Sequence, residues 1–149
     1  AGDARAACEP FLQTAHVIFT AQRDAEQVLG LSGSADDMIG QLHARYPQAR
    51  VVMTQGGDGA TACDESGRVA RQAALKAPQA IGRVGGGDAF SAGFLYGHLT
   101  DGSDLERALR WGVVVAGLKY TIPGDLPLID HEEAARLVDE SSGGHGLIR

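Results

Sequence analysis

The order of local signals along the chain predicts an α/β protein with a mostly parallel sheet. Apolar runs of strand type, at residues 16–20 and 50–54, alternate with segments of helical spacing. Two capping boxes, Ser34–Asp37 and Ser103–Glu106, mark the starts of two helices. The 149 residues suffice for one domain with a buried core, and neither a repeat nor an interdomain linker divides them.

In the first half, the pattern predicts a helix, a strand, two further helices and a second, buried strand. The alanine-rich start favours a helix that Pro10 interrupts or ends. The next helix covers about residues 24–29 and is closed by Gly30. The helix opened by the first capping box has one apolar face and ends before a proline; these residues are Met38, Ile39, Leu42 and Pro47.

In the second half, a hairpin is predicted over residues 60–73, with its turn at Glu65–Gly67. Three helices are then expected: from Ala89 to about Leu99, from the second capping box toward Tyr120, and from Asp130 to about Glu140. The tail from Ser141 is predicted to be mobile. The middle helix carries residues of one face at spacings of four and three: Leu105, Leu109, Gly112 and Ala116.

Composition excludes several classes of protein. The formal net charge is −6 and no basic run occurs, so nucleic-acid binding is not expected, although an anionic substrate can still meet a local positive site. No apolar stretch could span a bilayer, and the N-terminus does not resemble a signal peptide. Cys8 and Cys63 are interpreted as reduced packing residues, as expected of a cytoplasmic protein. The five histidines lack metal-ligand spacing and are interpreted as surface or packed residues, and Trp111 as core.

The segment Gly85–Asp88 is the most informative one. Three glycines before a helix let the backbone approach a ligand closely, and the first amides of a helix attract an anion. A carboxylate at Asp88 would then lie beside that anion, where it could accept the proton of an attacking hydroxyl. The alternative is a glycine-rich loop in which Asp88 is a plain helix N-cap.

Three segments, in order along the chain, resemble those of the ribokinase/PfkB-type carbohydrate kinases. Gly85–Gly93 is similar to the C-terminal signature D-x-x-G-A/G-G-D-x-F-x-A-G, and Thr54–Gly59 to the T-x-G-x-x-G turn. Lys119–Asp125 resembles the segment that flanks the adenine pocket and is most like that of 2-keto-3-deoxygluconate kinases. The resemblance covers nearly all of this chain, but only the C-terminal half of such an enzyme.

The resemblance implies a ribokinase-like three-layer sandwich, with residues 1–149 as the nucleotide-binding and catalytic part of a sugar kinase domain. It implies phosphorylation of a small sugar or sugar acid by ATP with Mg²⁺, although no metal cluster is visible in the sequence. The implied roles are Asp88 as base and substrate contact, Gly85, Gly86 and Gly87 as anion hole, Thr54, Gly56, Gly57 and Gly59 as ATP contacts, and Asp125 near the substrate or the nucleotide.

The chain departs from the family pattern in two places. Gly82 stands where the family has an aspartate, and Ala21–Asp24 stands where it has N-x-x-E. Arg83 either touches a phosphate or sugar acid or is a solvated side chain. The family's N-terminal half, with most sugar contacts and the β-sheet lid, has no counterpart in this sequence.

The sequence therefore predicts a kinase that converts 2-keto-3-deoxygluconate to its 6-phosphate. Another PfkB-type enzyme, such as a fructokinase or ribokinase, is the first alternative. A non-catalytic nucleotide-binding fragment is the second, because of the two departures. A homo-oligomer and a separate N-terminal half both remain open as partners.

Overall fold

The computed structural model describes residues 2–77, 80–82, 84–100 and 104–141. The chain divides into two compact units, which are residues 1–56 with 60–71, and residues 57–59 with 72–149. Some predicted features lie outside the described residues: Arg83, Ser103, His145 and the tail beyond Ser141.

Three helices belong to the first unit: α1 (Gly2–Leu12), α2 (Gln22–Gln27) and α3 (Ala35–Arg45). The expectation that Pro10 would end or interrupt the first helix is wrong. Pro10 lies only two residues before the end of α1, so its missing N–H removes one bond of the last turns, and Gln13 still donates to the Glu9 carbonyl at 3.1 Å.

The predicted start of α3 is confirmed, whereas α2 lies two residues earlier than predicted. α2 ends at Gln27 with Val28 as its C-cap, and Gly30, with a φ of +69°, follows in the turn where the Leu31 amide donates to the Ala25 carbonyl at 3.1 Å. At the start of α3, Ser34 accepts from the Asp37 amide, and the Asp37 carboxylate accepts from the Ser34 amide. These hydrogen bonds, the one from the Ser34 side chain first, hold the pKa of Asp37 below its ordinary value.

The sheet contains four strands in the order β1-β2-β3-β4: Val17–Ala21, Arg50–Thr54, Ala60–Cys63 and Val69–Gln72. β1 runs parallel to β2, and β2 runs antiparallel to β3. The α/β class is confirmed, but this sheet is mixed and not mostly parallel. The five residues between β2 and β3 are too few for a parallel crossover, so β3 returns alongside β2 in the opposite direction.

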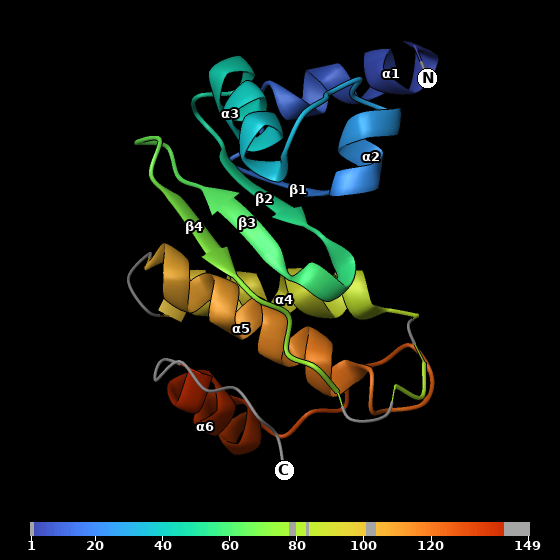
Figure 1. Ribbon diagram of the computed structural model, residues 1–149, viewed down its shortest axis with the longest axis vertical. Helices are drawn as coiled ribbons and strands as arrows, with labels where there is room; N and C mark the ends of the chain where they lie inside the picture. The colour runs from blue at the N-terminus through green and yellow to red at the C-terminus, as the bar shows by residue number, and fades with distance from the viewer. Residues whose placement is uncertain (1, 78–79, 83, 101–103, 142–149) are drawn as a thin grey trace. The chain divides into compact units, whose positions relative to one another are not determined.

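The core of the first unit lies between α3 and the sheet. Met38, Ile39 and Leu42 are fully buried, as their spacing predicted, and they pack with Val51 and Met53 of β2. Val51 and Met53 are two residues apart, so they point to the same face of the strand. Figure 1 shows α2 and α3 beside β1 and β2.

The second unit contains α4 (Gly86–Thr100), α5 (Leu105–Lys119) and α6 (His131–Ser141). The start of α5 differs from the prediction: its N-cap is Asp104, whose carboxylate accepts from the amides of Glu106 and Arg107 at 3.1 and 3.3 Å. Asp104 can reach the first-turn amides itself, so the helix starts one residue later than the capping box at Ser103 implied.

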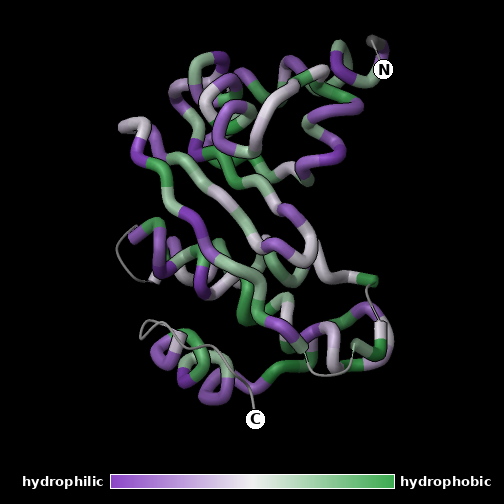
Figure 2. The backbone as a smooth tube through the Cα atoms, viewed as in Figure 1, coloured by the Kyte–Doolittle hydropathy of each residue, from purple (hydrophilic) through white to green (hydrophobic). Residues whose placement is uncertain are grey.

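Small residues bring α4 and α5 together. A Cβ atom at Gly93 would lie 2.6 Å from the Trp111 carbonyl oxygen, and one at Gly112 would lie 2.8 Å from the Phe90 ring. Trp111 is 4% exposed, which confirms it as a core residue, and the predicted face of α5 is buried throughout. Figure 2 shows hydrophobic and hydrophilic residues alternating along α6. The buried residues of α6 are Ala134, Leu137 and Val138.

An aromatic cluster joins the three helices of the second unit. The Tyr96 ring meets Trp111 edge-on, with ring centroids 4.6 Å apart, and its hydroxyl lies 2.7 Å from Nε2 of His131. The imidazole of His131 also stacks on Trp111 at 5.8 Å. His131 is therefore an exposed residue held by aromatic contacts, in agreement with the predicted surface or packed histidines, and His98 likewise stacks on Phe94.

The two cysteines differ from each other. Cys63 is buried in β3, and burial raises the pKa of its thiol, which agrees with a reduced packing residue. Cys8 is exposed on α1, so the packing interpretation is wrong for it. Within residues 2–77, 80–82, 84–100 and 104–141, no helix is both long and apolar enough to cross a membrane.

Candidate active site

The glycine segment opens helix α4. Gly85 has a φ of +78°, and its carbonyl accepts the first helical hydrogen bond, from the Ala89 amide at 2.9 Å. The amides of Gly86, Gly87 and Asp88 precede that bond and therefore have no acceptor within the helix. Asp88 is the third helical residue and Gly85 occupies the capping position, so the alternative that Asp88 is a plain N-cap is wrong.

Two of the predicted segments meet at this helix start. The position that a Cβ of Gly85 would occupy is taken by the backbone oxygen of Asp125, and a Cβ of Gly86 would lie 2.5 Å from the Tyr120 ring. The Tyr120 carbonyl also accepts from the Ile81 amide at 2.7 Å, just upstream of the glycines. The structure thus brings Gly85–Asp88 and Lys119–Asp125 together in the second unit, although they lie more than 30 residues apart.

Gly87 and Asp88 face open space. A Cβ at Gly87 would meet nothing within 4 Å, and both residues are exposed. Among the described residues, none donates a hydrogen bond to the Asp88 carboxylate. A carboxylate without such a partner therefore lies in the same helical turn as three amides that can bind an anion.

The end of α5 carries a buried cation that the sequence did not single out as such. Lys119 is 0% exposed, and its ammonium donates to the Ile122 carbonyl at 3.2 Å. A positive charge there complements the unpaired carbonyls at a helix C-terminus. Lys119 thereby holds the turn that leads to Asp125, whose own side chain is exposed.

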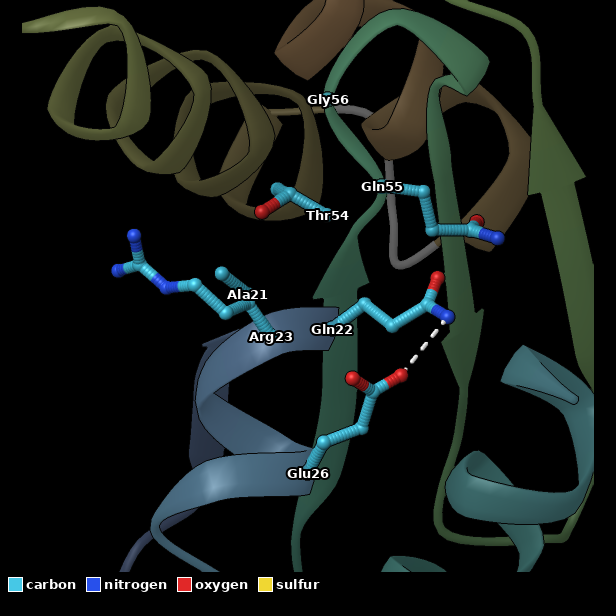
Figure 3. A pocket seen from close by; sticks show the side chains of 7 residues that line it. All are labelled: Ala21, Gln22, Arg23, Glu26, Thr54, Gln55 and Gly56. Carbon is cyan, nitrogen blue, oxygen red and sulfur yellow. Dashed lines mark hydrogen bonds between the residues drawn. The ribbon is translucent and has the colours of Figure 1, made fainter. Parts of the chain in front are cut away.

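In the first unit, Thr54 and Gly56 line a hollow of about 500 Å³ (Figure 3). It lies where the parallel strands β1 and β2 end, the edge at which α/β sheets commonly bind ligands. Arg23 and Glu26 contribute a cationic and an anionic side chain, and Gln22 donates to Glu26 at 3.1 Å. The complete lining is Ala21, Gln22, Arg23, Glu26, Thr54, Gln55 and Gly56.

The other two glycines of the Thr54–Gly59 turn belong to the second unit. Gly59 has a φ of +111°, and a Cβ there would collide with the backbone of residues 72–74. Gly57 resembles Gly87, since a Cβ at Gly57 would meet nothing within 4 Å. Of the four predicted ATP contacts, the structure places Thr54 and Gly56 on the hollow and Gly57 and Gly59 in the other unit.

The residues fit a metal ion that is shared with phosphate. No group of three or more His, Cys, Asp or Glu side chains forms a metal cage within the described residues. Mg²⁺ in phosphoryl-transfer sites is commonly held by one or two carboxylates together with phosphate oxygens, so a cage is not required. Asp24 is bound by Arg23 at 2.8 Å, whereas both oxygens of Asp88 lack a described partner.

A second hollow, of about 210 Å³, lies within the second unit. Its walls come from the chain just after β4, from the middle of α5 and from the last residue of α6. Five of the lining side chains are apolar, and Gln72 and Ser141 are polar. The apolar members are Ala73, Ala74, Leu75, Val113 and Val114. Sequence reasoning missed this hollow because its walls come from three separate segments.

Residues 1–130 match the model of the family described as pfkB family carbohydrate kinase. The chain is 35% identical over 142 residues to the 2-dehydro-3-deoxygalactonokinase of Haloferax volcanii, covering 95% of this chain and 44% of that protein. The chain thus spans less than half the length of this relative.

Two solved structures share the fold. The 2-dehydro-3-deoxygluconokinase of Thermotoga maritima superposes with a TM-score of 0.78 at 23% identity, over 92% of this chain and 45% of that one. The ribokinase of Arabidopsis thaliana, solved with ribose and ATP, gives 0.73 at 19% identity, over 85% and 42%. These likenesses confirm the ribokinase-like fold.

Proposed function

Since the chain belongs to the pfkB family of carbohydrate kinases, we propose that it carries the nucleotide-binding and catalytic part of a kinase that phosphorylates a sugar-acid hydroxyl with ATP. One observation supports this most directly: the exposed carboxylate of Asp88 lies in the first turn of α4, together with the amides of Gly86–Asp88 that have no helical acceptor. That turn offers a base and an anion hole in the same place.

In the proposed step, the Asp88 carboxylate takes the proton of the sugar hydroxyl while the hydroxyl oxygen attacks the γ-phosphorus of ATP. The bond from that phosphorus to the bridging oxygen breaks, and ADP leaves with the electron pair. The charge on the transferred phosphoryl oxygens would meet the amides of Gly86–Asp88, which follow the predicted Gly85–Gly87 anion hole and act by fixed orientation and not by covalent chemistry. Bound Mg²⁺ would offset charge on the phosphate oxygens, which would supply most of its ligands.

Nucleotide contacts are proposed separately for each unit. Thr54 and Gly56 line the larger one, where a hydroxyl and backbone amides can meet phosphate oxygens, and open space at Gly57 allows a ligand to approach the backbone. The smaller, mostly apolar hollow suits a single planar base such as adenine. Gly59 would allow the backbone conformation that its own turn requires.

The substrate is proposed to be 2-keto-3-deoxygluconate, phosphorylated at its 6-hydroxyl. The supporting observations are the Lys119–Asp125 segment and the 35% identity to a kinase of a 2-dehydro-3-deoxy sugar acid. Asp125 is proposed to lie near the substrate because its backbone touches Gly85. Another PfkB-type substrate, such as fructose or ribose, is the alternative, and a panel of these sugars would separate the two.

The decisive experiment replaces Asp88 in the complete polypeptide that carries this chain. Asp88→Asn keeps the size of the side chain but removes the base, so kcat should fall by about 10²–10⁴-fold while ATP still binds. Asp36→Asn is the matched control, because that carboxylate is already bound by Arg71 and lies outside the proposed site. An unchanged kcat in Asp88→Asn would contradict the proposed role.

A non-catalytic nucleotide-binding module is the second candidate, supported by Gly82 and Ala21, which stand where the family has polar side chains. Isothermal titration with ATP and Mg²⁺, run beside the phosphorylation assay, distinguishes the two. Binding without phosphorylation of any sugar favours the module. The absence of nucleotide binding would count against both functions.

A further inference from the structure

We propose that Tyr120 is a positioning residue, whose ring holds Gly86 in place and so fixes the direction of the first amides of α4 and of Asp88. The inference rests on the kinase function proposed above and adds a residue to the same site. The sequence assigned no role to Tyr120 within its segment, and only the packing around Gly86 points to one.

The contact between Tyr120 and Gly86 leaves no room for a side chain. A Cβ added to Gly86 would lie 2.5 Å from Cε1, 2.7 Å from the hydroxyl oxygen and 2.9 Å from Cζ of Tyr120. Cβ atoms essentially never approach other heavy atoms so closely, so the ring edge must lie directly against the Gly86 backbone. Gly86 is buried by this contact, whereas Gly87 and Asp88, the next two residues, are exposed.

The requirement for glycine at position 86 is steric and not conformational. Gly85 has a positive φ of +78°, which disfavours any other residue, but Gly86 is not among the glycines with positive φ. Gly86 begins a regular helix, in which alanine would be favoured over glycine by about 1 kcal/mol if space allowed. The Tyr120 ring is therefore the reason why alanine does not fit there.

Tyr120 is itself anchored on rigid structure. Its amide donates to the Ala116 carbonyl at 3.2 Å at the end of α5, and its carbonyl accepts from the Ile81 amide at 2.7 Å. The ring therefore keeps the start of α4, which carries Asp88, at a fixed position relative to α5. Because a shift of about 1 Å in a catalytic group can cost roughly 100-fold in rate, this contact bears directly on turnover.

The test is a set of size exchanges in the complete kinase, measured as kcat and as KM for the sugar. Gly86→Ala should lower kcat by roughly 10- to 100-fold, since the new methyl displaces the helix start. Tyr120→Ala should lower kcat by about tenfold with an unchanged KM, because orientation is lost but binding is not. The double variant Gly86→Ala/Tyr120→Ala should exceed Gly86→Ala alone in kcat, since the methyl then has space.

Two further variants make the test specific to the ring. Tyr120→Phe keeps the Cε1 edge, so it should largely restore the kcat lost in Tyr120→Ala, and it should not rescue Gly86→Ala. Gly87→Ala serves as the control for coupling: its Cβ would have no neighbour within 4 Å, so no change at Tyr120 should rescue it. If Tyr120→Ala does not fold, Tyr120→Leu takes its place, because leucine keeps much of the buried volume.

The outcomes separate this inference from the proposed function. If Gly86→Ala and the Tyr120 change are simply additive in kcat, or if removing the ring leaves kcat unaltered, the positioning role of Tyr120 is overturned. Asp88→Asn is measured in the same series. Full activity of Asp88→Asn would refute the kinase role of that residue, whereas a strong loss there beside a neutral Tyr120→Ala would refute only the inference about Tyr120.

Discussion

Two glycine-rich turns contain residues of the proposed function. They differ in how strongly the surrounding structure requires glycine at each position. In the turn before α4, Gly85 is held by a positive φ and by the Asp125 backbone, and Gly86 by the Tyr120 ring. In the turn after β2, Gly59 alone is confined by neighbouring backbone, while Gly56 has a positive φ in open space.

The comparison separates the glycines that the fold itself requires from those that it does not require. Gly57 and Gly87 do not have a positive φ, and a Cβ added at either would have no neighbour within 4 Å. The described structure gives no steric or conformational reason for a glycine at either position, and under the proposed function these glycines leave room for a ligand. Each turn thus combines glycines that shape the backbone with one that we propose leaves room for a phosphate.

The largest effect on stability is expected at Gly59. Gly59→Ala combines a φ of +111° with a collision against the backbone of residues 72–74, so the free energy of unfolding should fall by roughly 2–5 kcal/mol. Urea denaturation followed by circular dichroism measures this change. The matched control is Gly57→Ala in the same turn, and equal losses in the two variants would break the comparison.

A smaller effect on stability, but a clear one on catalysis, is expected at Gly87. Gly87→Ala should change the free energy of unfolding by less than about 0.5 kcal/mol, because its methyl points into open space. The same methyl would enter the path of the phosphoryl group, so kcat/KM for ATP should fall by about tenfold or more. Unchanged kcat/KM would show that this glycine faces solvent and not a ligand.

The smallest effect is expected at a third turn, which is held by its own side chains. Burial, the largest single influence, raises the pKa of Asp64 between β3 and β4, but hydrogen bonds from Ser66 and from the Arg68 amide together lower it below its ordinary value of 3.8. Its stabilising contribution is therefore complete above pH 3.8 and is lost as the pH falls through the lowered pKa.

That turn is tested by comparing the acid unfolding of Asp64→Asn with that of the parent. The variant should lose about 1 kcal/mol at neutral pH and should lack this part of the acid dependence. The two glycine turns provide no such titrating hydrogen-bond acceptor in the described structure. An unaltered pH profile would mean that Gly67, with its φ of +87°, suffices to form the turn.

Local signals determined much of this protein in advance. The capping box of Ser34 and Asp37 and the helix that follows the glycine segment were both predicted, because each depends on residues within one turn of one another. The three motif segments likewise predicted the family, since their letters are contiguous in the sequence.

Contacts between distant segments were decided by the tertiary structure alone. The sequence indicated a mostly parallel sheet, but the direction of β3 follows from its pairing with β2. Tyr120 had no predicted role until its ring was found against Gly86, 34 positions away along the chain. Periodicity and capping report on neighbours within a few residues, whereas the space around a glycine depends on which side chain a remote helix delivers there.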